Sequence, residues 1–266
     1  MAKLDSNAAW KEASALVAAN REVLFALAGV FFLIPSLAFA VFIGEPAMEP
    51  GMDREQMLAA MSEFYGKAWW LILLSSVMQI VGILAVLTLM RDRSRPTVGE
   101  AIAAGLGGTL SYLAAQLLFI VGLALVGGLL IGVLSLVSPV LGVVTACVMF
   151  LAAVFLGFRL ILLAPVVAVE GQRNPITALR RSWALTQGNF WRIFAFVALV
   201  TILFLIVLGI IMLVVGLILA VATSGDVQRI IAAAISSALT AVAIVYFAGI
   251  LAAIHRQLAG PRGDAA

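Results

Sequence analysis

The chain has 266 residues, of which 64% are hydrophobic and only 11% are charged. A soluble globular domain is about 45–50% apolar and about 25% charged, so this composition excludes one and predicts that lipid surrounds most of the chain. The formal charge of +3 is not arranged as a basic stripe interleaved with aromatic residues, which argues against nucleic-acid binding.

Six apolar segments are long enough to span a bilayer. A hydrocarbon core about 30 Å thick needs about 20 helical residues, because each residue rises about 1.5 Å. The uncharged stretch 101–158 is too long for one span and should fold back at Ser135, Ser138 and Pro139. The predicted fold class is therefore all-α, a single polytopic transmembrane bundle over residues 1–266 with short interfacial helices. Its six spans cover residues 23–254, approximately as 23–43, 68–90, 109–134, 141–157, 193–222 and 230–254.

The N-terminal residues 1–22 are expected to form a short helix on the cytoplasmic membrane surface, through Leu4, Ala8, Trp10, Leu16 and Ala19. An alternative treats the first apolar run as a cleaved signal peptide, with Ala38, Phe39 and Ala40 as an A-x-A cleavage site. The 22 preceding residues are long for such a peptide. Within the first span, Pro35 cannot donate to the Phe31 carbonyl and should kink the helix.

The distribution of Lys and Arg predicts the orientation, because basic loops are retained in the cytoplasm. The predicted outer side has Arg54, Lys67 and Arg229 only, and its acidic loop contains Glu45, Glu49, Asp53, Glu55 and Glu63. That loop lacks the spacing of a calcium site and is interpreted as solvated. Both termini, including the tail 255–266, are predicted to be cytoplasmic, on the side that carries Lys3, Lys11, Arg21, Arg91, Arg93, Arg95, Arg173, Arg180, Arg181, Arg192, Arg256 and Arg262.

Two cytoplasmic connections should contain helices rather than slack loops. Thr97 and Glu100 have the spacing of a capping box, which predicts a surface helix before the third span. Asn174 as N-cap with Pro175 at the first helical position predicts a second one, which Gly188 is placed to end.

The spans contain neutral polar residues but no charge near a centre, whereas transporters usually hold a charge at depth. Gly128 and Gly132 form a G-x-x-x-G pattern that favours close helix packing within the bundle, or dimerisation through the same face. A transporter or flippase for an amphiphile remains an alternative if Gln79, Gln116 and Ser237 line one cavity. Interhelical hydrogen bonding is the other explanation for the polar set Gln79, Gln116, Thr145, Thr201, Ser236, Ser237, Thr240 and Tyr246.

Catalytic residues are not expected in this chain. The only histidine, His255, has no Ser, Cys or carboxylate nearby in sequence and is interpreted as an interfacial residue. The single cysteine, Cys147, lies in an apolar run and provides neither a disulfide nor a metal cluster. We therefore expect no catalytic residue, no metal and no cofactor.

The segment from Arg159 to Arg192 has more specific features than a simple loop. Ile176, Leu179 and Trp183 recur at helical spacing and can lie in the membrane interface. Arginines beside them could contact anionic lipid phosphates through their planar guanidinium groups, or could merely fix the orientation. The candidate lipid or partner contacts are Arg159, Arg180, Arg181, Trp183, Trp191 and Arg192.

The same segment resembles the membrane domain associated with glycerophosphoryl diester phosphodiesterases and the related YciC-like inner-membrane proteins. The resemblance rests on Pro165, Glu170, Ala178, Leu179, Arg180, Arg181, Ser182, Trp183, Leu185, Thr186, Gly188, Asn189, Phe190 and Trp191. It implies a polytopic protein of the bacterial inner membrane. In this family the catalytic residues belong to a fused soluble barrel, so the resemblance transfers no catalytic residue to this chain.

The leading hypothesis is a non-enzymatic membrane protein that binds anionic lipid, or organises a protein partner, through the arginine-rich helix. The alternative is the transporter or flippase described above. The lipid, the partner and any homo-oligomer are left open by the residues.

Overall fold

The computed structural model describes residues 3–44, 51–91 and 96–260, and these residues form helices without any β-strand. Six helices are long and apolar enough to cross a membrane, which confirms the predicted all-α fold and the number of spans. In chain order the elements are α1 (Ser6–Ala19), α2 (Arg21–Ala28), a π-helical turn (Gly29–Leu33), α3 (Ile34–Phe42), α4 (Arg54–Leu89), α5 (Val98–Val137), α6 (Pro139–Arg159), α7 (Leu163–Ala168), α8 (Pro175–Thr186), α9 (Phe190–Ala222) and α10 (Gly225–Ala259).

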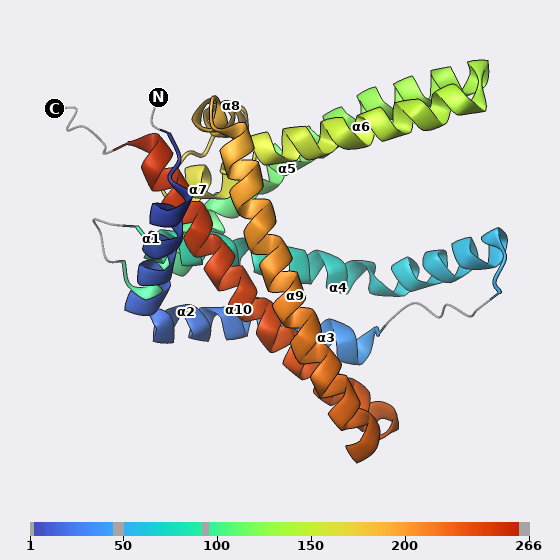
Figure 1. Cartoon of the computed structure of the whole chain (residues 1–266), viewed down its shortest axis with the longest axis horizontal. Helices are drawn as coiled ribbons and strands as arrows, with labels where there is room; N and C mark the ends of the chain where they lie inside the picture. Colours follow the sequence, from blue (N-terminus) through green and yellow to red (C-terminus); the bar gives the residue numbers. More distant parts are fainter. Residues whose placement is uncertain (1–2, 45–50, 92–95, 261–266) are drawn as a thin grey trace.

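The helices converge at one end of the molecule and diverge from it. Figure 1 shows both termini, α1, α7 and α8 at this end, which we call the packed end, while α4, the α5–α6 hairpin and the α9–α10 hairpin extend away separately. Fully buried side chains such as Leu24, Leu84 and Ile254 belong to the core of the packed end. Away from it, Leu136 is 90% exposed and Val221 is 92% exposed. Such surfaces are compatible with lipid as the surrounding solvent.

The predicted surface helix before the third span is not a separate element. The capping box is present, because the Thr97 amide donates to Glu100 Oε2 at 2.8 Å and the Glu100 amide donates to Thr97 Oγ1 at 3.3 Å. The helix that starts there continues for 40 residues as α5, about 60 Å at the usual rise. The predicted helix is therefore present, and it leads into the third span without a break. The predicted turn is confirmed at Ser138, with Pro139 opening α6.

The first span departs from regular α-helix next to Pro35, as predicted. The π-helical turn lies directly before α3, and the Ile34 amide bonds to the Gly29 carbonyl, five residues back. Such a wider turn is one way in which a helix accommodates a proline ring.

The predicted acidic loop is helical from Arg54 onward. Asp53 caps α4, because its carboxylate accepts from the Gln56 amide at 2.8 Å while the Asp53 amide donates to Gln56 Oε1 at 3.0 Å. The 36 residues of α4 therefore include Glu55 and Glu63, which sequence analysis assigned to a loop. Other residues of the charge analysis lie outside the described residues: Glu45, Glu49, Arg93, Arg95 and Arg262.

Helix α1 is present and docks on α10 with one face, while Ala8, Trp10 and Ala19 of the predicted apolar set are exposed, and their contact with the membrane surface stays a prediction. Its buried residues are Ala9, Ala13 and Val17, whereas Trp10 is 38% exposed. A Cβ added to Gly249 of α10 would lie 3.2 Å from Val17, so the two backbones approach closely.

Glycines bring α5 against α4. A Cβ on Gly105 would lie 2.8 Å from the Val81 carbonyl oxygen and 3.2 Å from the Ala85 amide nitrogen. By contrast, nothing lies within 4 Å of a Cβ built on Gly128 or Gly132. The predicted packing of the G-x-x-x-G face within the bundle is therefore wrong for this chain, and dimerisation through that face stays a prediction.

These glycines provide a matched test on one helix. Gly105→Ala should lower the free energy of unfolding by about 1–3 kcal/mol, because its methyl group meets backbone that must shift. Gly128→Ala should leave stability unchanged or slightly raised, because it adds the same methyl group in open space and favours helix. Thermal denaturation of both variants in detergent, followed by size-exclusion chromatography, would measure the difference. Equal melting temperatures would contradict the described α4–α5 contact.

Candidate functional site

Helix α8 is positioned by caps at both ends. Asn174 Oδ1 accepts from the Ile176 and Thr177 amides at 3.0 and 3.2 Å, and Pro175 occupies the first turn. Gly188 follows the helix with a φ of 79°, a left-handed conformation that a residue with a side chain adopts at a cost. Both predicted helix signals are confirmed. The helix lies across the packed end, where it contacts α5, α6, α7 and α10.

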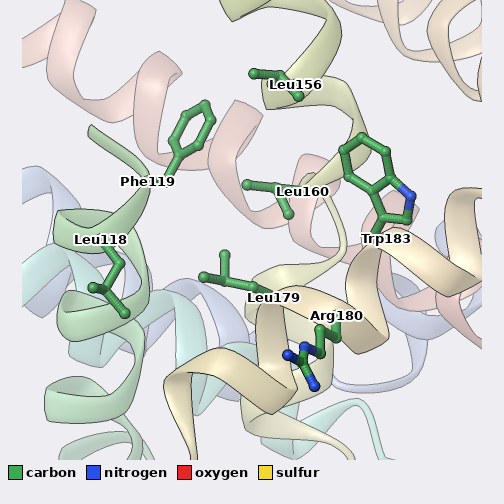
Figure 2. A pocket seen from close by; sticks show the side chains of 7 residues that line it. All are labelled: Leu118, Phe119, Leu156, Leu160, Leu179, Arg180 and Trp183. Carbon is green, nitrogen blue, oxygen red and sulfur yellow. The ribbon is translucent and has the colours of Figure 1, made fainter. Parts of the chain in front are cut away.

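A cavity of about 380 Å³ lies between α5, α6 and α8. Its walls are almost entirely apolar: Leu118 and Phe119 come from α5, Leu156 from α6 and Leu160 from the turn that follows it, and Leu179, Arg180 and Trp183 from α8. Figure 2 shows the three groups of side chains around the same space, with the Arg180 guanidinium and the Trp183 indole at its α8 side. The cavity is open to the outside, so an apolar chain can enter without a rearrangement of the backbone.

Arg159, the last residue of α6, lies in a box of aromatic rings beside this cavity. Its guanidinium carbon is 4.8 Å from the Trp183 ring centroid, 5.4 Å from that of Phe155 and 5.8 Å from that of Phe190. A guanidinium over an aromatic face is attracted by the ring quadrupole. The negative end of the α6 dipole also favours a cation at this position.

The main-chain carbonyl and the side chain of Arg159 differ in their hydrogen bonds. Ser182 Oγ and Thr186 Oγ1, both buried on α8, lie 3.2 and 3.1 Å from the Arg159 carbonyl oxygen, so they cap a carbonyl that the end of α6 leaves unpaired. The side-chain nitrogens Nε and Nη1 are buried and have no hydrogen-bond partner among residues 3–44, 51–91 and 96–260. Within these residues, two buried donors of a charged group are thus left without an acceptor.

Arg181 faces a different set of residues. Its Nε donates to both carboxylate oxygens of Glu170, at 3.1 and 3.0 Å, and His255 Nε2 lies 2.9 Å from Glu170 Oε1. The His255 side chain is only 5% exposed. Sequence analysis found no carboxylate near His255 in sequence, and its partner Glu170 is 85 residues away and reaches it only in the folded bundle.

Glu170 remains a carboxylate in this network. Burial alone would raise its pKa, but hydrogen bonds from His255 and Arg181, together with their charges, lower the pKa from 4.5 to about 2. The carboxylate joins the segment before α8 to the end of α10. Arg181 therefore ties α8 to Glu170, while its side chain stays 42% exposed.

The remaining predicted contacts lie apart from the cavity. Trp191 is 75% exposed and packs edge-on against Phe190 and Phe194 of its own helix. Arg192 is exposed and does not line the cavity. The structure thus groups Arg159, Arg180 and Trp183, and separates Arg181, Trp191 and Arg192 from them.

Sequence reasoning missed the walls that α5 and α6 contribute. Leu118, Phe119, Leu156 and Leu160 read as ordinary span residues, and no local pattern distinguishes a cavity-lining leucine from a lipid-facing one. The position of Glu170 within the family motif was the one signal for the ionic network, and it named no partner.

The neutral polar residues do not form part of this cavity. Gln79, Gln116 and Ser237 do not line it, and the Gln116 amide donates to the Tyr112 hydroxyl at 3.1 Å within α5. That bond is consistent with a structural role of Gln116. Within the described ranges, no three His, Cys, Asp or Glu side chains are grouped so as to hold a metal ion.

The Glu170 network predicts a pH-dependent contribution to stability. A depressed pKa in the folded state stabilises the fold above the unfolded value of 4.5, and this contribution is lost as the pH falls from there through about 2. Glu170→Gln should therefore lower the free energy of unfolding by about 1–3 kcal/mol at pH 7. The gap between variant and wild type should narrow as the pH falls below about 4.5. Thermal unfolding in detergent from pH 3 to pH 7 would measure it.

Glu63→Gln is the matched control, because it makes the same change in a carboxylate that pairs with Lys67 on the exposed surface of α4. The variant should unfold like the wild type, since exposed pairs contribute little. A Glu170→Gln variant as stable as Glu63→Gln at pH 7 would show that the network does not hold α8.

Comparison with known proteins gives one match. No curated protein and no solved structure matches the chain. The matched family model covers the end of α5, all of α6 to α9 and nearly all of α10, and so includes Arg159, the whole of α8 and His255. Residues 133–258 match the family described as the membrane domain of glycerophosphoryl diester phosphodiesterase, and this confirms the resemblance predicted from the arginine-rich segment.

Proposed function

We propose that the chain is a non-enzymatic membrane protein that binds an anionic amphiphile in the cavity between α5, α6 and α8. The observation that carries the proposal is the composition of the cavity wall, in which apolar side chains from three helices surround a space that Arg180 borders. Ligand sites are concave, mostly apolar and provided with a few polar groups that set orientation. An acyl chain fits the apolar part, and an anionic headgroup fits the arginine.

The same proposal includes an orientation. We place the packed end, with α8 and both termini, at the cytoplasmic face of a bacterial inner membrane. The basic residues support this placement, because Arg21, Arg91, Arg180 and Arg256 belong to loops or helix ends on the side of the termini, whereas Arg54 and Arg229 begin helices on the opposite side. Arg180 then lies at the depth of lipid phosphates in the inner leaflet.

Cysteine labelling tests the orientation. In a Cys147→Ser background, Glu55→Cys and Gln187→Cys each place one thiol at an exposed position, on opposite sides of the bundle. A membrane-impermeant maleimide should label Glu55→Cys in intact spheroplasts, and should label Gln187→Cys only after the membrane is opened. The reverse pattern would invert the topology and remove Arg180 from the inner leaflet.

Lipid analysis tests the binding site. The protein is extracted gently, and its retained lipids are quantified by mass spectrometry for the wild type, Arg180→Glu and the control Arg21→Glu. Arg180→Glu places a negative charge at the cavity without disturbing the Glu170–Arg181 pair. It should lose an anionic lipid that the wild type retains, by at least about tenfold, since a charge-assisted contact contributes about 1.5–3 kcal/mol. Arg21→Glu makes the same charge change at an exposed residue of α2 that does not line the cavity.

The control decides between site binding and general attraction to basic surfaces. Equal loss of lipid in both variants would indicate bulk electrostatics and contradict a site at the cavity. Unselective lipid in all samples would also contradict it, and would favour the alternative in which α8 organises a protein partner.

A further inference from the structure

One side chain, that of Trp183, contacts both Arg159 and the cavity. Leu156 near the end of α6 and Leu160 just after it line the cavity, while Phe155 and Arg159, each one residue earlier, lie against the rings of Trp183 and Phe190. Trp183 belongs to both groups, because it lines the cavity (Figure 2) and lies against the Arg159 guanidinium at 4.8 Å. The indole is therefore in contact with the guanidinium and borders the cavity.

The covered state leaves the charge of Arg159 poorly compensated. A ring face attracts the cation but accepts no conventional hydrogen bond, and the buried Nε and Nη1 have no acceptor in the described part of the chain. Burying charged donors without an acceptor carries a desolvation cost. The Glu170 carboxylate is bound to Arg181 and His255. An oxyanion that reached Arg159 would supply the missing acceptors.

We infer that Arg159 is the residue that recognises the anionic group of the ligand, and that this group is a phosphate which displaces Trp183. The inference rests on the proposed binding of an amphiphile in the cavity. Trp183 is 38% exposed and can turn away from the bundle, whereas Phe155 and Phe190 keep the guanidinium in place. A guanidinium donates two parallel hydrogen bonds to phosphate, so the tetrahedral oxyanion matches the donors that the ring covers.

The apolar tail of the ligand would occupy the cavity beside Arg159. An acyl chain between Leu118, Leu156 and Leu179 would bring a phosphate at its end to the α8 wall, where Arg180 adds a second positive charge. The ligand is thus a phosphate-bearing amphiphile, in which chain and phosphate are joined, and not free phosphate. Arg180 attracts the ligand at the edge, and Arg159 determines its specificity.

Trp183 itself provides the readout. Trp10, Trp69, Trp70 and Trp191 are replaced by Phe, so that Trp183 is the one remaining tryptophan, and the protein is kept in dodecyl maltoside. Dodecyl phosphate is then titrated, and quenching of Trp183 by acrylamide is measured. Quenching should increase as the ring leaves Arg159, at dodecyl phosphate concentrations at which inorganic phosphate has no effect. The neutral detergent serves as the background for the chain alone.

Variants of Arg159 and Arg180 separate the two roles. Arg159→Gln should show high quenching without ligand and no further response, and Arg159→Lys should respond at least about tenfold more weakly, because an ammonium lacks the planar fork. Arg180→Gln should keep the full response at a higher ligand concentration. Size-exclusion profiles and melting temperatures of all three show whether each is folded, and the Lys variant retains the charge if the Gln variant is not.

The results distinguish the inference from the proposed function. If Arg159→Lys and wild type respond alike, or if inorganic phosphate is as effective as dodecyl phosphate, the assignment of Arg159 is wrong while lipid binding at the cavity stands. If dodecyl phosphate gives no response in the wild type and the wild type retains no anionic lipid in the mass-spectrometric comparison, the proposed function fails first.

Discussion

The fold depends on how closely its helices can approach one another, because lipid tails are as apolar as the helix surfaces and provide no hydrophobic force to join them. Contact must come from packing and from polar bonds. At the packed end both are present: Gly105 admits the backbone of α4, Gly82 admits the side chains of Phe31 and Phe32, and Gly249 admits α1. Away from that end large side chains such as those of Leu136 and Val221 are exposed, and the hairpins separate. The candidate site lies where α5, α6 and α8 come close enough to form a cavity.

The arginines of the candidate site differ in whether an acceptor already binds their guanidinium groups. Glu170 accepts hydrogen bonds from Arg181 Nε and contacts His255, and in this way it anchors α8 to α10. The cavity wall formed by Leu179, Arg180 and Trp183 therefore keeps a fixed position. Arg180 remains exposed at the cavity. Arg159 is charged and partly buried, and its buried Nε and Nη1 have no acceptor among the described residues. One arginine is therefore tied into the bundle, and the other two are those that we propose for binding, although all three have the same chemistry and lie within one short stretch of sequence.

Local chemistry determined what could be predicted from sequence. Thr97, Asn174, Gly188 and Pro139 act on the nearest turn of backbone, so the helix starts and ends they imply are present. Pairings across the bundle were different. The partner of His255 is 85 residues away, and the leucines of the cavity wall have the composition of any lipid-facing surface. The arginine-rich segment was recognised as special. Which of its arginines is tied into the bundle, and which we propose for binding, follows from tertiary contacts alone.

Helix α1 is held by bonds that join the beginning of the chain to its end. The Leu4 amide donates to Asn189 Oδ1 at 3.0 Å, the Asp5 amide donates to Gln257 Oε1 at 3.1 Å, and Glu12 pairs with Arg256 at 3.3 Å. During synthesis these partners emerge only after the intervening spans, so α1 has to wait, undocked, until the last span has been inserted. The docked state of α1 therefore requires that the last span has already been made.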